Sequence, residues 1–177
     1  MAHDYRATVR WQRNGAVFTD NRYSRGHVWR FDGGTEVPAS SAPSSVKLPY
    51  SVAEAVDPEE ALVAAVSSCH MLFFLNYAAI GGFTVDSYVD EAVGTMTKND
   101  AGKLYVSRVV LRPAIAFAGA KHPTEAEVEA LHHRSHEDCF IANSIRGEVI
   151  VEAPAIAFSA EVDTGSAQEN AINKDLA

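Results

Sequence analysis

The 177-residue chain is predicted to adopt an α+β fold, because its strand-like and helix-like segments occur in blocks and do not alternate regularly. Strand-like segments come first and are followed by one long apolar helix, residues 58–79. Two long strand-like segments, a second helix and two short strands complete the chain. The length fits a single domain, which we place at residues 1–163, followed by a polar tail at 164–177.

The helix at residues 58–79 has the clearest sequence signals. The stretch DPEE at 57–60 supplies an N-cap aspartate, a proline at the first helical position and carboxylates in the first turn. The glycine pair at 81–82 is typical of a helix end. Apolar residues lie on nearly every side, so this helix should be buried on all sides. We therefore expect a homodimer in which two copies of the helix pack together.

The strands before this helix are predicted from alternation and turn signals. Residues 3–11 alternate as a half-buried strand, and Asn14-Gly15 indicates a hairpin turn into a second strand at 16–19. A third strand is expected at 27–31. Three prolines and several serines favour a long loop at 35–50.

After the long helix, residues 85–98 and 103–117 read as two long strands joined by the turn at 99–102. Thr124 and Glu127 match a capping box, which predicts a helix over residues 125–139. Residues 146–151 and 155–162 then form the closing strands.

Composition excludes several classes of function. The net charge of −8 argues against a nucleic-acid surface, which needs a basic stripe. The first residues lack a secretory signal, and polar residues interrupt the apolar run, so we expect no membrane span and a cytoplasmic protein. In a reducing cytoplasm, two cysteines are free thiols, ligands or a redox pair more often than a structural disulfide.

Two cysteines stand in unusual surroundings. Cys69 follows two serines and precedes His70 within the apolar helix, although a free cysteine can also be a simple core residue. His132, His136 and Cys139 share one helical face, and with Cys69 or His70 they could bind zinc. Cys69 with a histidine base could also act as an acyl-transferase nucleophile. None of these alternatives is decided by the residues alone.

The paired motifs resemble those of the OsmC/Ohr family of osmotically inducible and organic hydroperoxide resistance proteins. The first is the proline-glutamate helix at 57–60 with Ser67-Ser68-Cys69-His70, and the second is the segment CFIANS at 139–144. They occur in the order that the family has, with a helix-hairpin-helix layout between them. The resemblance covers the chain to about Val162 and implies antiparallel sheets around a long buried central helix in an intertwined homodimer.

The resemblance also implies a function, that of a thiol peroxidase acting on organic hydroperoxides. By motif match, Cys69 would attack the peroxide and Cys139 would resolve the sulfenic acid as a disulfide, while Glu59 matches the family's glutamate. For the family's arginine we choose Arg25, with Arg22 and Arg30 as rivals. The resemblance implies no bound cofactor and an external reductant, either a dithiol or a lipoylated protein.

This chemistry is consistent with the residues. The thiolate is the reactive form of cysteine, and burial in an apolar helix raises a thiol pKa. A guanidinium nearby favours the charged form, and apolar neighbours such as Leu72 and Phe73 suit an alkyl peroxide. The alternatives are a binding or stress protein of the same fold with little turnover, and a histidine- and cysteine-based metal-binding protein.

Overall fold

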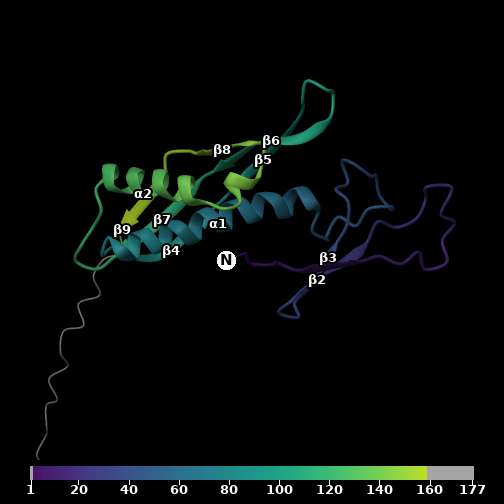
Figure 1. Ribbon diagram of the computed structural model, residues 1–177, viewed down its shortest axis with the longest axis horizontal. Helices are drawn as coiled ribbons and strands as arrows, with labels where there is room; N and C mark the ends of the chain where they lie inside the picture. The colour runs from purple at the N-terminus through teal and green to yellow at the C-terminus, as the bar shows by residue number, and fades with distance from the viewer. Residues whose placement is uncertain (1, 159–177) are drawn as a thin grey trace, which may run out of the picture.

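The long helix α1, Pro58–Ile80, is the axis around which the other elements are arranged (Figure 1). Its start is stabilised by a reciprocal cap, in which Asp57 Oδ1 accepts from the Glu60 amide at 2.8 Å and Glu60 Oε2 accepts from the Asp57 amide at 3.2 Å. The helix ends at Gly81. These bounds confirm the helix predicted from the capping signals. The computed structural model describes residues 2–158, so the predicted tail at 164–177 and residues 159–162 of the last predicted strand lie outside the described residues.

Two three-stranded sheets follow α1, and the α+β class is confirmed. They contain β4 (Thr84–Asp90), β5 (Val93–Lys98), β6 (Leu104–Leu111), β7 (Pro113–Ala118), β8 (Glu148–Val151) and β9 (Ala155–Phe158). The strand orders are β4-β7-β9 and β5-β6-β8, and the pairs β4–β7 and β5–β6 are antiparallel. The outer strands β8 and β9 pair in parallel, which corrects the expectation of purely antiparallel sheets. The chain returns through a helix before β8, and such a crossover permits parallel pairing.

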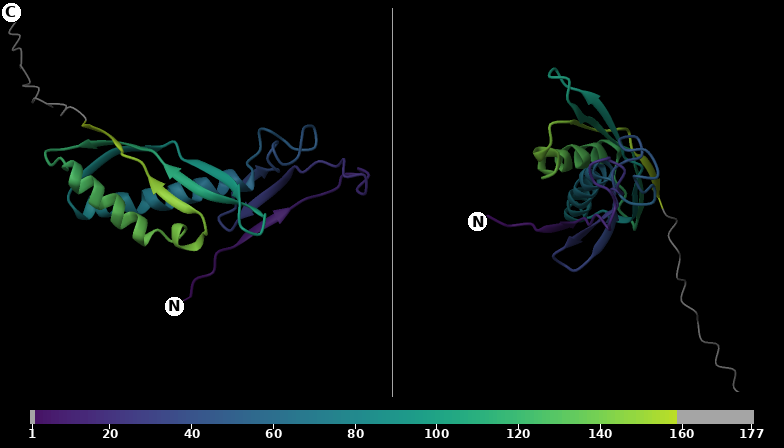
Figure 2. Two further views of the ribbon diagram at one scale, coloured as in Figure 1. Left: turned by 90° about the horizontal axis from the view of Figure 1, so that it is seen from above. Right: turned by 90° about the vertical axis from the view of Figure 1, so that its right-hand side faces the viewer.

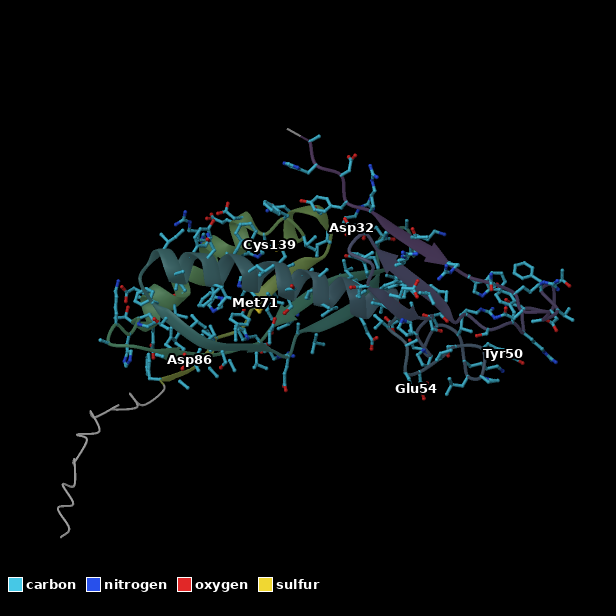
Figure 3. All side chains as sticks on the ribbon, turned by 90° about the horizontal axis from the view of Figure 1, so that it is seen from below. Asp32, Tyr50, Glu54, Met71, Asp86 and Cys139 are labelled. Atoms are coloured by element: carbon cyan, nitrogen blue, oxygen red, sulfur yellow. The ribbon has the colours of Figure 1, made fainter. Side chains whose placement is uncertain are left out.

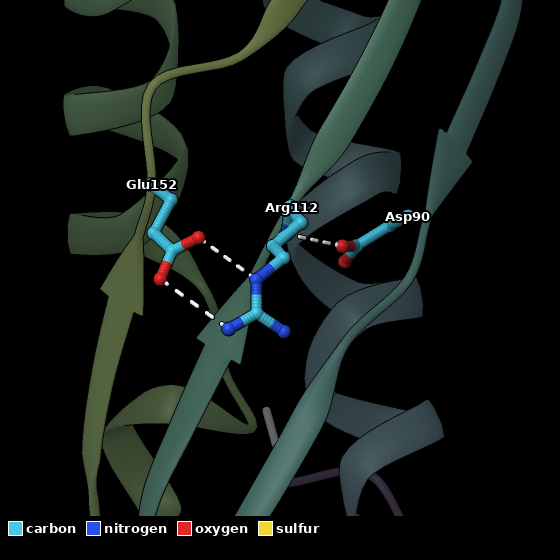
Figure 4. A network of polar contacts seen from close by, with 3 residues as sticks. All are labelled: Asp90, Arg112 and Glu152. Carbon is cyan, nitrogen blue, oxygen red and sulfur yellow. Dashed lines mark hydrogen bonds and ion pairs between the residues drawn. The ribbon is translucent and has the colours of Figure 1, made fainter.

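The predicted pair of unbroken long strands is wrong, because both strands are interrupted at the same level. β4 ends at Asp90, and β6 ends one residue before Arg112. Asp90 Oδ1 accepts from the Arg112 amide at 2.6 Å, and Asp90 Oδ2 accepts from Ser67 Oγ of α1 at 2.5 Å. The Arg112 guanidinium pairs with Glu152, with Nε at 2.8 Å (Figure 4). Asp90 thus fixes the break in the hairpin and ties it to α1.

The second helix, α2 (Glu125–Asp138), packs along α1 and carries the predicted capping box of Thr124 and Glu127. One buried cluster lies between α1, α2 and the β4-β7-β9 sheet and contains Phe74, Ala78, Phe83, Ile115, Phe117 and Val128. A second cluster between α1 and the β5-β6-β8 sheet contains Val66, Val109 and Leu111. These clusters hold α1 and α2 in fixed relative positions.

The N-terminal residues form a separate three-stranded antiparallel sheet that extends beyond the start of α1 (Figures 1 and 2). It consists of β1 (Ala7–Arg10), β2 (His27–Phe31) and β3 (Glu36–Ala39). The predicted strand at 16–19 is wrong, because β1 pairs with β2 and the residues between them form turns and irregular backbone. The predicted loop at 35–50 is wrong in its first part, where β3 forms. Pro38 is tolerated there because β3 is an edge strand.

One face of α1 is not covered by the described part of its own chain. Five residues of the helix are buried, whereas Leu72 is 61% and Ile80 is 70% exposed. The expectation that α1 is buried on every side therefore does not hold for one chain. By length and composition α1 could cross a membrane, but core helices of soluble proteins pass the same test. A second copy that covers this face remains a prediction.

Candidate functional site

Cys69 lies in the middle of α1 and is half-buried. The helix is fixed on both sides of it, by the Ser67–Asp90 hydrogen bond two residues earlier and by the buried side chains of His70 and Phe74, one and five residues later. The sulfur therefore has a defined position and remains partly accessible. These are the properties that a thiol needs if it is to meet a substrate.

Cys139 is the C-cap of α2 and is fully buried. Its extended backbone turns the chain out of α2 into a short 3-10 turn, Ala142–Ser144. The Ala142 amide donates to Cys139 Sγ at 3.4 Å. Asn143 Nδ2 donates to the carbonyls of Glu137 and Cys139 at 2.8 and 3.1 Å, which holds the turn in place. The second motif, residues 139–144, therefore holds the Cys139 side chain and the turn that follows it in a fixed position.

The two thiols lie side by side, although 70 positions separate them in the chain. Both cysteines are free thiols, and they are close enough for Cys69 to act on the ionisation of Cys139. The pKa of Cys139 is raised to about 11, mainly by burial; the Ala142 amide lowers it in part, and the neighbouring Cys69 raises it. At neutral pH Cys139 is therefore a protonated thiol. Phe73 and the exposed Phe140 contact each other edge to face at 5.0 Å between centroids, just beside the two cysteines in the sequence.

Arg25 does not reach either cysteine within this chain. Its guanidinium donates to the carbonyl groups of Asn21 and Tyr23 and to Asn21 Oδ1, and lies 3.9 Å from the centroid of the Tyr23 ring. It lies just before β2 in the N-terminal part, at the opposite end of the molecule from α2. Figure 3 shows this separation, with Cys139 in the α1–α2 body and Tyr50 and Glu54 in the N-terminal part. The rivals Arg22 and Arg30 are exposed in the same N-terminal part.

Glu59 is half-buried in the first turn of α1 and forms no hydrogen bond or ion pair within residues 2–158. Ten residues separate it from Cys69, so the two lie about 15 Å apart along the helix axis. Glu59 lines an open groove of about 870 Å³, which also contains Ser67, Met71 and Tyr88. The groove lies between the first half of α1 and strands β4, β5 and β6, and Met71, labelled in Figure 3, is one of its lining residues. Within one chain, therefore, the structure brings together Cys69 and Cys139 but neither Arg25 nor Glu59.

The histidines do not form the zinc site that the sequence left open as an alternative. His132 points toward α1 and forms a 2.9 Å hydrogen bond between its Nδ1 and Nε2 of His70, while His136 is exposed. Among the described residues, no group of three histidine, cysteine or acidic side chains is close enough together to hold a metal ion. The spacing of His132, His136 and Cys139 predicted one shared helical face only if the helix included residue 139. Because α2 ends at Asp138 and Cys139 has extended backbone, Cys139 does not share that face.

Sequence reasoning missed two features of the site. The buried His70–His132 pair joins α1 to α2, and burial lowers the pKa of each imidazole to about 4. A histidine next to a cysteine in an apolar helix was a signal for a buried polar contact, but its partner is 62 positions away. The Ala142 amide that contacts Cys139 Sγ carries no side-chain signal at all.

Comparison with known proteins places the chain in a family. Residues 51–153 match the model of the OsmC-like protein family. The chain belongs to this family. An OsmC-like protein of unknown function from Vibrio cholerae is 51% identical, with a TM-score of 0.84 over 88% of this chain and 99% of that protein. A comparison with curated proteins found no match.

More distant OsmC-like structures share the fold. An organic hydroperoxide resistance protein OsmC from Legionella pneumophila is 17% identical, with a TM-score of 0.61 over 89% of this chain and 98% of that protein. An organic hydroperoxide resistance protein from Elizabethkingia anophelis is 16% identical, with a TM-score of 0.60 over 90% and 99% of the two chains. The OsmC-like fold expected from the paired cysteine motifs is confirmed.

Proposed function

We propose that this OsmC-family protein is a thiol peroxidase that reduces organic hydroperoxides to alcohols. The observation that carries the proposal is the contact between Cys69 of α1 and Cys139 at the end of α2. Two reduced thiols in contact form a dithiol that can close to a disulfide with little movement. Family members named organic hydroperoxide resistance proteins support the choice of substrate class.

The reaction has two chemical steps on the protein. The Cys69 thiolate attacks the terminal oxygen of the hydroperoxide, an S–O bond forms, the O–O bond breaks, and the alkoxide takes a proton to leave as an alcohol. The Cys139 thiol then attacks the Cys69 sulfenic acid, an S–S bond forms, and water leaves. An external dithiol or a lipoylated protein in a reducing cytoplasm reduces the disulfide by exchange, and becomes a disulfide itself.

Burial and charge support this division of roles. Cys69 is half-buried and can be approached by a substrate, whereas Cys139 is fully buried. The raised pKa of Cys139, about 11, keeps this thiol protonated and disfavours it as the first nucleophile. Cys139 is also held by the Ala142 amide against the position where the sulfenic acid would form. Cys69 is therefore the peroxidatic thiol in our proposal, and Cys139 the resolving one.

The activating groups come from a second copy of the chain in this proposal. Glu59 lies too far along α1 to reach Cys69 of its own chain, and Arg25 is bound to its own loop in the N-terminal sheet. The uncovered face of α1 suits an antiparallel contact with the same face of a partner. Such a homodimer places the start of one α1 beside the middle of the other. An arginine between the partner's glutamate and the thiolate would favour the charged sulfur and donate to the peroxide.

The test is peroxide consumption by the purified protein with cumene hydroperoxide and a dithiol. We expect Cys69→Ser to abolish consumption, since no thiolate remains at the attacking position. Cys139→Ser should complete one turnover and then depend on a monothiol for recycling. Mass spectrometry after one equivalent of peroxide should show loss of two hydrogens in the wild type and addition of one oxygen in Cys139→Ser.

Equal residual activity of the two variants would refute the assignment of roles. A wild-type protein that neither consumes the hydroperoxide nor loses two hydrogens would refute the peroxidase proposal. That result would favour the alternative of a binding or stress protein with the OsmC-like fold and little turnover.

A further inference from the structure

A second cavity lies on the other side of α2 from the cysteines. It has a volume of about 690 Å³, and its walls come from α2 and from the β8–β9 segment. The two elements lie next to each other in both Figure 1 and Figure 2. A cavity of this size is within the range of small-molecule sites. The proposed peroxidase chemistry does not use it.

One residue in the wall of the cavity has a buried imidazole nitrogen without a partner. His132 lines the cavity and is 5% exposed. Its Nδ1 is occupied by His70 on the α1 side, so Nε2 faces away from α1, toward the cavity side of α2. Within residues 2–158, this Nε2 has no hydrogen-bond partner. Buried polar atoms are nearly always paired, because an unpaired one loses its hydration without compensation.

The charges around this nitrogen are negative. Glu129 and Glu125 line the cavity about one and two turns before His132 on the same side of α2, and neither forms an ion pair within the described residues. The third carboxylate, Glu152, is already paired with Arg112. Burial lowers the pKa of His132 to about 4, so its ring adds no positive charge at neutral pH. No lysine or arginine lines this cavity, so it favours a cation.

The opposite wall is apolar. Val149, Val151 and Ile156 of β8 and β9 face the helix across the cavity. A ligand that fits both walls has a positively charged head and an apolar body. The charged head also needs several hydrogen-bond donors, because the carboxylates of Glu125 and Glu129 and an unprotonated Nε2 of His132 are acceptors.

We infer that this cavity binds a small organic cation, a primary ammonium compound with a short apolar body. Its ammonium group has three donors. They match the Nε2 of His132 and the carboxylates of Glu125 and Glu129. The apolar body would lie against the β8–β9 wall. The site is separate from the cysteine pair, so the inference does not depend on the proposed peroxidase activity.

The histidine pair gives this binding a specific signature. An ammonium donor requires a bare Nε2 on His132, so the proton of this ring must be on Nδ1 and be donated to Nε2 of His70. His70 then carries its own proton on Nδ1. Binding therefore selects one tautomer of both rings, and nitrogen NMR distinguishes the two tautomers directly.

The experiment is a titration of the full chain, labelled with ¹⁵N-histidine, with hexylammonium. Hexanol and hexanoate serve as probes with the same body and a neutral or a negative head. Spectra of His132→Gln assign the His132 resonances. We expect a saturable shift of His132 Nε2 toward the unprotonated position with hexylammonium, at least about tenfold weaker binding of hexanol, and none of hexanoate.

Variants test the carboxylates. Glu125→Gln and Glu129→Gln should each weaken hexylammonium binding by about five- to tenfold. Glu137→Gln is the matched control, since Glu137 is an exposed acid on the same helix that does not line the cavity and is paired with His133. Cys69→Ser should bind as the wild type does. Equal affinity for hexanol, insensitivity to both glutamine variants, or a response to Zn²⁺ but none to hexylammonium would overturn the inference.

Discussion

The two faces of α1 have similar compositions but different surroundings. One face carries Val66, His70, Phe74 and Tyr77, and all four are buried against α2 and the two sheets. The other carries Ala64, Ser68, Leu72, Asn76 and Ile80, and these residues are exposed in the single chain. The difference teaches that an apolar composition predicts that a helix face will be covered but does not say by what.

Cys69 lies between these two faces and is half-buried for that reason. The covered face gives it Cys139, through the packing of α2 on α1. The other two predicted site residues lie away from it, Glu59 in the first turn of α1 and Arg25 just before β2. One chain brings the two cysteines together but not the glutamate and the arginine, and for this reason we expect a second chain to supply them.

The first prediction has the largest expected effect. It tests whether the uncovered face of α1 is completed by a second chain, by asking whether peroxidase activity returns when two inactive variants are mixed. Glu59→Ala and Cys69→Ser subunits should each be inactive alone. If each site combines Glu59 of one chain with Cys69 of the other, a mixed dimer has one intact site. In an equal mixture half of the dimers are mixed, so about one quarter of the wild-type activity should return.

The control for this experiment is a demonstration of subunit exchange by native mass spectrometry with one subunit isotopically labelled. With exchange shown, an inactive mixture would mean that each site is formed within one chain. If Glu59→Ala is active on its own, Glu59 is a first-turn carboxylate that interacts only with the helix dipole.

Local signals predicted much of the fold. The capping boxes at Asp57 and Thr124 are formed by residues three positions apart, and both helices begin where these boxes place them. The two cysteine motifs, taken together, led to the OsmC-like fold, and that fold brings Cys69 and Cys139 into contact. In these cases the information lies in neighbouring residues or in a pattern shared with a whole family.

Features that depend on distant contacts were not predictable. The break in the long hairpin depends on Asp90 meeting the Arg112 amide, 22 positions away. The strand β3 forms because β2 offers it an edge, despite Pro38. His132 was read as a possible metal ligand with His136, whereas its hydrogen-bond partner is His70 on another helix. Sequence spacing along one helix cannot reveal which side chains a second helix supplies.

The second prediction compares one residue from each face. Phe74→Ala removes a fully buried ring that contacts Phe117 and His132, and should lower the free energy of unfolding by about 3–5 kcal/mol. Leu72→Ala, at a site 61% exposed in one chain, should change the unfolding of an isolated chain by less than about 0.5 kcal/mol. If a second copy covers Leu72, this variant should instead weaken dimerisation by about tenfold or more.

Urea unfolding at fixed protein concentration measures the first effect, and sedimentation over a range of concentrations measures the second. A wild-type protein that sediments as a monomer at micromolar concentration would contradict the expected homodimer. A dimer whose dissociation is the same in Leu72→Ala would show that the contact uses another surface.

The third prediction has the smallest expected effect and concerns only the covered face of α1. It is the pH dependence of the free energy of unfolding that arises from the His70–His132 pair. Both imidazoles have a pKa lowered to about 4, mainly by burial, against 6.5 for an ordinary histidine. The charges that act on His70 include His136, which lowers its pKa, and Asp90, which raises it. Because the folded-state pKa values are depressed, the unfolded chain binds more protons between pH 6.5 and 4. Stability should therefore be insensitive to these groups above pH 6.5 and fall as the pH drops through this window.

Each histidine should contribute a loss of about 1 kcal/mol between pH 6 and pH 5, since the unfolded form is mostly protonated there and the folded form is not. His132→Gln removes one titrating group of the pair, and the slope of unfolding free energy against pH should be about half as steep. His133→Gln is the matched control, because His133 is exposed on the same helix and pairs only with Glu137. The slope is the decisive quantity, since His132→Gln also changes packing and will lower stability at every pH. If the wild type and both variants have the same slope, the pair titrates as ordinary exposed histidines do, and the covered face of α1 is more open to water than the structure indicates.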